Sequence, residues 1–281
     1  MPATVVYRPM TDADLPAALA LSEQLKWPHR LDDWAMLLRL SLGFVALDGE
    51  RLIGTAFTCP QGDYATIGLV IVSSDYQGKG IGRALMELAL DACQTRTPIL
   101  NATRAGALLY VSQGFVEFGQ IAQHQGLAHA PALHPLADTQ TCRPLEGADQ
   151  PRVLELANAA TGMDRGAVLD VLFDAVDYSL GIESEGQLRA FALLRVCGRG
   201  LSIGPVVAEN LDQARHLIGV LLAQVPGEFV RIDIPADGGL GDWLETVGLM
   251  AVDSVTQMAR GGPPQVTGDV RQFALVSQAI G

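Results

Sequence analysis

The sequence predicts a mixed α/β (α+β) fold made of two tandem copies of one domain. Over the first 125 residues, short apolar runs typical of strands alternate with amphipathic stretches typical of helices. A set of landmarks then recurs in the same order about 135 residues later. The chain has 281 residues, of which 49% are hydrophobic and 18% charged, so it can bury two modest cores.

The repeat rests on four landmarks at nearly constant spacing. Arg8-Pro9 with Ala13-Asp14 recurs as Arg143-Pro144 with Ala148-Asp149. The later pairs, in the same order, are Leu52 with Leu188, Ile67-Gly68 with Ile203-Gly204, and Gly114 with Gly248. Two units indicate a pseudo-dimer rather than a solenoid. We expect a first domain over residues 1–125, a linker rich in Ala, Pro and His over 126–141, and a second domain over 142–281.

Hydrophobic periodicity divides the first copy into elements around a central sheet. Strands are expected at 4–8, 44–48, 51–58, 64–72, 99–102 and 115–123. Helices are expected at 12–24, at 32–41, after a glycine segment to about residue 93, and at 105–113. Asp48-Gly49 is a hairpin turn signal, and the run 69–72 is apolar on both faces, which is typical of a buried strand. The weakly alternating tail 268–281 predicts an added edge strand.

Composition excludes several classes of partner. The formal net charge of −12 and the pI near 4.7 disfavour nucleic acid and anionic membranes. The longest apolar runs are strand-sized, and the N-terminus has no charged region followed by an apolar one, so we expect a cytoplasmic protein. The four cysteines are widely separated and lack metal-ligand spacing, which predicts reduced packing residues and no metal site.

Three glycines lie directly before a predicted helix, in Gln77-Gly78-Lys79-Gly80-Ile81-Gly82. Free backbone N–H groups at the positive end of a helix bind phosphate, and glycine lets a ligand approach and allows positive φ. The spacing matches neither a Walker A loop nor a dinucleotide GxGxxG fingerprint. A glycine-rich turn without a ligand is the alternative.

These residues, between "LVIV" and "RALMELAL" and followed by "LLYVSQGF" at 108–115, resemble the GNAT superfamily of acetyl-CoA-dependent N-acetyltransferases. The resemblance covers about the first 125 residues. It implies that the acetyl-CoA pyrophosphate is held by Gln77, Gly78, Lys79, Gly80, Ile81, Gly82 and Arg83. It further implies that Val70, Ile71 and Val72 pair with the pantetheine arm, and that Tyr110 lies beside the thioester sulfur. The family's usual asparagine seven residues before this tyrosine is Thr103 here, while Asn101 lies nearby, and both are candidates for the arm.

Acetyl transfer requires a neutral amine, a donor for the developing oxyanion and a proton for the departing thiolate. A backbone N–H near Val70 or Val72 can polarise the carbonyl, and the Tyr110 hydroxyl can supply the proton. The alternative for Tyr110 is a packing residue. No covalent nucleophile is required.

The segment "KWPHRLDDW", residues 26–34, is the expected acceptor loop. Trp27 could form an apolar wall, His29 could be the base or a substrate contact, and Asp33 could hold a cationic amine. The alternatives are a helix cap for an aspartate, a core position for Trp34 and a solvated loop position for His29. Asp63 is a further candidate base, or a turn residue.

The second copy lacks the glycine loop and the tyrosine. Glu209 and Asp212 would repel phosphate there, and Leu244 stands at the position of Tyr110. We therefore expect one active site, an acetyltransferase acting on a primary amine of a small molecule, in a monomer with an internal pseudo-dimer or in a homodimer. A non-catalytic acyl-CoA sensor and a protein or peptide acetyltransferase are the alternatives.

Overall fold

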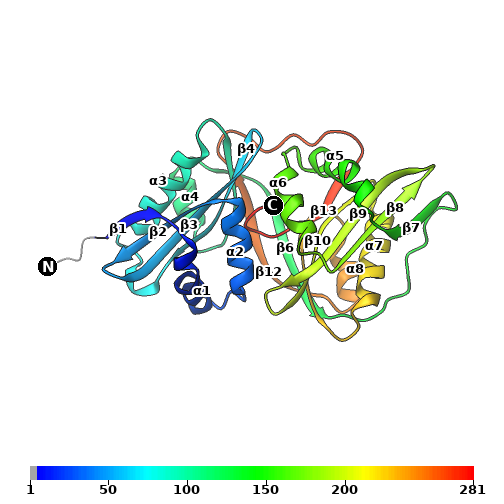
Figure 1. The fold of residues 1–281 in the computed structure, drawn as a ribbon, viewed down its shortest axis with the longest axis horizontal. Coiled ribbons are helices and arrows are strands. Elements are labelled where there is room, and N and C mark those ends of the chain that lie inside the picture. Colours follow the sequence, from blue (N-terminus) through cyan, green and yellow to red (C-terminus); the bar gives the residue numbers. More distant parts are fainter. Residues whose placement is uncertain (1–4) are drawn as a thin grey trace.

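A computed structural model, which describes residues 5–281, shows two lobes that repeat one order of elements (Figure 1). The first repeat contains β1 (Val6–Pro9), α1 (Leu15–Gln24), α2 (Leu31–Leu40), β2 (Leu42–Asp48), β3 (Arg51–Gln61), β4 (Tyr64–Val72), α3 (Ile81–Cys93), β5 (Thr97–Ala102), α4 (Ala107–Ser112) and β6 (Val116–Leu127). Thr4, where the first strand was expected to begin, lies outside the described residues.

The second repeat follows the first element by element. It contains β7 (Gln140–Pro144), α5 (Gln150–Thr161), α6 (Gly166–Phe173), β8 (Tyr178–Ser184), β9 (Gln187–Cys197), β10 (Gly200–Ala208), α7 (Leu211–Gln224), β11 (Phe229–Pro235), α8 (Gly241–Thr246) and β12 (Met250–Ala259). One further strand, β13 (Arg271–Ala274), comes after the second repeat.

An ion pair explains why the first landmark recurs. The Arg8 guanidinium donates to both carboxylate oxygens of Asp14, at 2.8 and 2.7 Å. Arg143 makes the same bidentate contact to Asp149, at 2.7 and 2.9 Å. In each lobe the pair ties the first strand to the short turn before the first helix, so the two residue types are needed at the same spacing.

The two lobes exchange their last strands. One continuous sheet runs in the order β1-β2-β3-β4-β5-β12-β6-β11-β10-β9-β8-β7. Strand β12 therefore completes the sheet of the first lobe beside β5, and β6 completes the sheet of the second lobe beside β11 (Figure 1). The expected linker, 126–141, includes the end of β6 and the start of β7. Each half is therefore continuous in sequence, but each lobe contains one strand from the other half.

Helices cover equivalent parts of the sheet in the two lobes. Helices α1, α2, α5 and α6 contribute to a single apolar core that spans both lobes and includes Trp34, Phe57 and Phe191. Helix α3 packs on β2, β3 and β4 of the first lobe, and α7 packs on β8, β9 and β10 of the second. The indole of Trp34 is buried and donates to the Ser22 hydroxyl at 3.3 Å. Trp34 is thus a core residue.

The tail pattern predicts an added edge strand, and this prediction is wrong in its position. The tail does form a strand, β13, but that strand does not lie at an edge of the sheet. It pairs with β10, opposite Val206 to Ala208, while β9 pairs with the other side of β10. None of the helices within residues 5–281 combines the length and the apolar composition that crossing a membrane requires. The four cysteines are free, and Cys59 and Cys93 are buried.

Candidate active site

The glycine loop connects the end of β4 to the start of α3. Gly78 and Gly80 have φ angles of 74° and 83°, and a Cβ on either would meet open space. Glycine is therefore required by the left-handed backbone conformation, which costs other residues roughly 1–2 kcal/mol. Gly80 is the N-cap residue of α3, and the N–H groups of the first helical turn, residues 81–83, have no acceptor within the helix. The loop can bind an anion.

Side chains of the same loop brace it. The Gln77 amide donates to the Val72 carbonyl at 3.1 Å, and the Lys79 ammonium donates to the Asp75 carbonyl at 2.9 Å. Lys79 also lies 4.7 Å from the centre of the Tyr76 ring. Arg83 is exposed on the first turn of α3. Two cationic side chains therefore flank the free N–H groups.

Strands β4 and β5 separate before they end. Their parallel pairing stops at Ile67 opposite Leu100, and Leu69 follows with a φ of 49° where the β3–β4 register shifts. The carbonyl of Leu69 accepts from the Thr55 hydroxyl at 2.7 Å, which stabilises the distortion. The edge of β4 that faces β5 is therefore unpaired from Val70 to Val72. An extended ligand arm can pair there.

Tyr110 is buried on α4, with 8% of its surface exposed. Its ring meets Phe115 edge to face at 6.2 Å, and a Cβ on Gly106 would lie 2.8 Å from the ring. Burial raises the pKa of Tyr110 to about 12, so the hydroxyl keeps its proton at neutral pH. It can donate a proton or a hydrogen bond.

A cavity of about 360 Å³ lies between the two lobes. The first lobe contributes Trp27, His29, Asp33, Leu69, Asn101 and Thr103. The second lobe and the tail contribute Arg195, Ser202, Arg231, Asp233 and residues 276–279. The structure thus brings the acceptor loop together with Asn101, Thr103 and the distorted part of β4. The glycine loop and Tyr110 are not part of this wall.

The structure separates Asp63 from this cavity. Asp63 is exposed in the turn between β3 and β4, at the opposite end of β4 from the glycine loop. Its carbonyl accepts from the Thr97 amide at 2.9 Å. Asp63 is a turn residue, and its candidacy as a base was wrong.

His29 and Asp33 have well-defined surroundings. His29 lies edge to face between Trp27 and Trp34, and burial lowers its pKa to about 4. A neutral imidazole can accept a hydrogen bond from an amine but holds a proton poorly at pH 7. One oxygen of Asp33 accepts from the Arg30 amide at 2.8 Å and from the Gly198 amide at 3.0 Å, so Asp33 both caps α2 and joins the lobes.

Asn101 is hydrogen-bonded to the C-terminal tail of the chain. Its amide nitrogen donates to the Gln278 carbonyl at 2.8 Å, while its amide oxygen is buried without a hydrogen-bond partner among the described residues. Thr103 directly follows β5, and its carbonyl accepts from the Gly106 and Ala107 amides at the start of α4. The tail therefore forms part of the cavity wall beside Asn101.

The second lobe supplies site residues that the sequence reading missed. Four strand residues of this lobe form part of the cavity wall: Arg195, Ser202, Arg231 and Asp233. The available signal was a charged residue inside an otherwise apolar strand, as in "ALLRVC" and "FVRIDI". Such a residue is costly to bury unless it has a partner.

The equivalent cleft of the second lobe is filled by the chain. Strands β10 and β11 pair in parallel from Leu201 to Ile203 and then separate, and β13 occupies the gap. The Leu275 amide donates to the Asp233 carbonyl at 2.9 Å. The start of α7 is capped by Asn210, which accepts from the Gln213 amide. At this cleft, the tail therefore covers the strand edge and a side chain caps the helix start.

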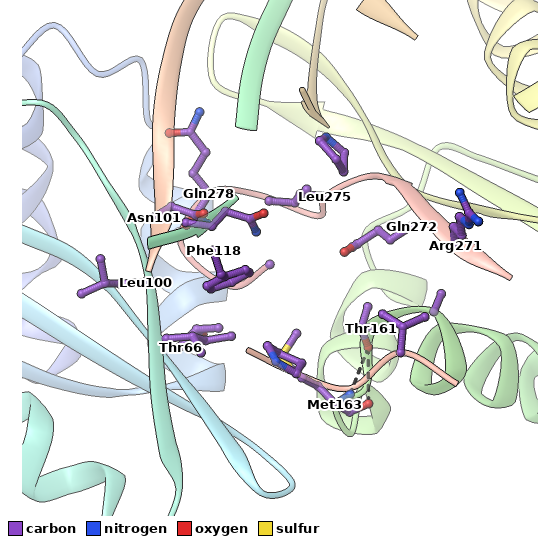
Figure 2. Close-up of a pocket in the computed structure, with 17 residues that line it drawn as sticks. Thr66, Leu100, Asn101, Phe118, Thr161, Met163, Arg271, Gln272, Leu275 and Gln278 are labelled. Atoms are coloured by element: carbon purple, nitrogen blue, oxygen red, sulfur yellow. Dashed lines mark hydrogen bonds between the residues drawn. The ribbon is translucent and has the colours of Figure 1, made fainter. Parts of the chain in front are cut away.

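A second cavity, also of about 360 Å³, lies on another side of the tail (Figure 2). Figure 2 shows Thr66 and Leu100 of the first lobe on one side of this cavity and Thr161 and Met163 of the second lobe on the other. Asn101 and Gln278 line both cavities, so the tail separates them. The acceptor-loop residues are not among those that line this second cavity.

Comparisons with known proteins agree with this architecture. Two families, both described as acetyltransferase (GNAT) domain, match residues 40–117 and 153–274. The uncharacterized N-acetyltransferase YitH of Bacillus subtilis is 31% identical over 227 residues, which is 78% of each chain. The holothin acyltransferase of a Pseudoalteromonas species is 26% identical over 248 residues, covering 85% of this chain and 82% of that one.

A solved structure has the same fold. The chain aligns with a Pyrococcus horikoshii protein assigned as an acetyltransferase with a TM-score of 0.81 at 20% identity. The alignment covers 100% of this chain and 97% of that one. The likeness therefore includes both lobes and their arrangement.

Proposed function

Because the chain belongs to the GNAT acetyltransferase family and is an acyltransferase, we propose that it transfers the acetyl group of acetyl-CoA to a primary amine of a small molecule. The observation that carries this proposal is the unpaired part of β4. It begins at the cavity, beside Gly68 and Leu69, and ends at the glycine loop. One ligand that reaches from the loop to the cavity would follow this edge.

The residues of the loop fit the cofactor. The open space around Gly78 and Gly80, the free N–H groups of α3, and Lys79 and Arg83 suit a pyrophosphate. Bound acetyl-CoA supplies an acetyl group activated as a thioester. The backbone of Val70 to Val72 would align the arm, with Asn101 and Thr103 near its end.

The chain's own groups can then assist the transfer. A backbone N–H beyond the distortion at Leu69 would polarise the carbonyl as the amine nitrogen bonds to the acetyl carbon. As the carbon–sulfur bond breaks, the buried Tyr110 hydroxyl would give its proton to the thiolate, and the proton that the amine nitrogen loses would return to Tyr110 through water, so that the products are the amide and the free thiol. His29, which is neutral, would accept a hydrogen bond from the amine, and its Nδ1 is buried and unpartnered among residues 5–281. Trp27 would form the apolar wall.

The size of the cavity supports a small acceptor. Its volume of about 360 Å³ lies at the low end of the range for small-molecule sites, whereas a peptide would need an extended groove.

Burial raises the pKa of the Cys197 thiol in this wall, so it is protonated at neutral pH and unsuited to carry the acetyl group. Direct transfer is therefore favoured. We also propose a cytoplasmic location, in keeping with four free cysteines.

The test is release of free thiol from acetyl-CoA with a panel of primary amines and short peptides. We expect turnover with small amines, confirmed by mass spectrometry of the acetylated product. Binding of acetyl-CoA without turnover of any acceptor would support a sensor instead. Turnover restricted to peptides would overturn the small-molecule acceptor.

A further inference from the structure

The second lobe presents a row of polar side chains to the cavity. Arg195 of β9 lies directly opposite Ser202 of β10, and Ser202 lies directly opposite Arg231 of β11. The row continues to Gln125 of β6, and all four residues line the cavity. Directly opposite residues share one face of a sheet. Two guanidinium groups therefore flank a serine on the face turned toward the acceptor loop.

The two arginines differ in their partners. Arg231 makes a bidentate contact to Asp233, with its closest distance at 2.8 Å. Arg195 is only 3% exposed, yet its hydrogen bonds, to the carbonyls of Val196 and Val276, are both 3.4 Å long. Its nearest carboxylate, that of Asp33, is 3.8 Å away.

The Nε of Arg195 is also buried without a hydrogen-bond partner among residues 5–281. Leaving a buried donor unsatisfied costs free energy, and the cost is greater when the group is charged. A ligand that supplied one acceptor group with a negative charge would remove this cost. The guanidinium fork suits a planar carboxylate, which it can bind through two parallel hydrogen bonds.

The remaining charges of the cavity limit the ligand further. Besides the two arginines of the row, the charged residues that line it are Asp33, Asp233, Asp253, Lys26 and Arg199. Both signs of charge are therefore present, so a carboxylate at Arg195 and an ammonium group near the aspartates, before it loses its proton, can each lie close to the opposite charge. A molecule with one amine and one carboxylate matches this pattern of charge.

We propose that the acceptor is an amino acid or a similar zwitterion, and that Arg195 of the second lobe binds its carboxylate. This inference rests on the proposed acetyltransferase activity. It gives the second lobe a direct part in substrate selection, although that lobe has no cofactor cleft of its own.

The test compares amino acids with their primary amides as acceptors at one pH. For the wild type we expect kcat/KM to be at least tenfold higher for a carboxylate than for its amide. In Arg195→Gln we expect this ratio to fall at least tenfold, mainly through the KM of the carboxylate, with the KM of acetyl-CoA changed less than twofold. Comparing ratios between variants cancels the difference in amine pKa between acid and amide.

Arg189→Gln is the matched control. Arg189 lies on the same strand but pairs with Glu209 at 3.8 Å and does not line the cavity. In this variant, the ratio of kcat/KM for the carboxylate to kcat/KM for the amide should equal that of the wild type. If thermal melting shows that Arg195→Gln does not fold, Arg195→Lys keeps the charge beside Asp33 while losing the planar fork, and its ratio should fall severalfold.

Two results would overturn the inference and leave the enzyme an acetyltransferase. One is an unchanged ratio in a folded Arg195 variant, and the other is turnover restricted to amines without a carboxylate. Absence of turnover with every acceptor would instead contradict the proposed function itself.

Discussion

At the scale of single residues, Tyr110 and Leu244 form a natural comparison. Each is the fourth residue of its helix, α4 or α8, and each is buried. The second lobe packs well with leucine at this position, which is 0% exposed. The fold therefore does not require a hydroxyl at this position.

Tyr110→Phe should lower kcat well over tenfold, because it removes one proton donor while keeping the buried ring. General acid catalysis contributes ~10²–10⁴-fold. The affinity for acetyl-CoA should change less than threefold, about 0.7 kcal/mol. Steady-state kinetics and calorimetry on the same preparation measure the two quantities. A kcat near that of the wild type would show that another group protonates the thiolate and that Tyr110 only packs.

At the scale of elements, the starts of α3 and α7 differ in what satisfies them. Helix α3 begins after glycines in left-handed conformation and has no side-chain cap. Helix α7 begins with Asn210 as its cap, and the neighbouring Glu209 carboxylate accepts from the Gln213 side chain at 3.0 Å. Only the first arrangement leaves donors for a phosphate.

Calorimetry should therefore find one acetyl-CoA per chain, and Gly80→Glu should abolish binding by placing a carboxylate among the free N–H groups. Gly186→Glu controls for backbone strain, since Gly186 has a φ of 74° and equally open surroundings in the β8–β9 turn. This control should bind normally while losing similar thermal stability. Two sites per chain, or equal loss of binding in both variants, would contradict the assignment of the loop.

At the scale of the whole molecule, strand exchange makes each lobe depend on the other. Strand β5 pairs with β12, and β6 pairs with both β11 and β12. A chain ending at the linker would leave the β5 edge and all of β6 unpaired, and unpaired edges promote aggregation. The covalent connection after β6, in contrast, passes through the exposed turn at Asp138 and Thr139.

Residues 1–138 expressed alone should therefore be unfolded or aggregated. The full chain, cut at a protease site inserted between Asp138 and Thr139, should remain associated and melt in one transition within a few degrees of the uncut protein. Circular dichroism and size-exclusion chromatography measure both outcomes. A folded, monomeric product from residues 1–138 would show that the exchanged strands are dispensable.

The sequence by itself determined the family, the two repeats and the order of elements. These features depend on local patterns: apolar periodicity, glycines at positive φ, and the recurring spacing of Arg8 and Asp14 in the second copy. The expected strands and helices of the first copy lie within a few residues of those observed. Loss of the cofactor cleft in the second copy was also predictable, from the missing glycines and the acidic residues.

The tertiary structure alone decided which residues share the cavity. Strand exchange, the insertion of β13 between β10 and β11, and the approach of Arg195 to Asp33 join segments far apart in the chain. No local pattern specifies such contacts, because they depend on how the faces of two lobes are buried against each other. The tail shows the reason most clearly: its alternation predicted a strand, but only the gap between β10 and β11 determined where that strand binds.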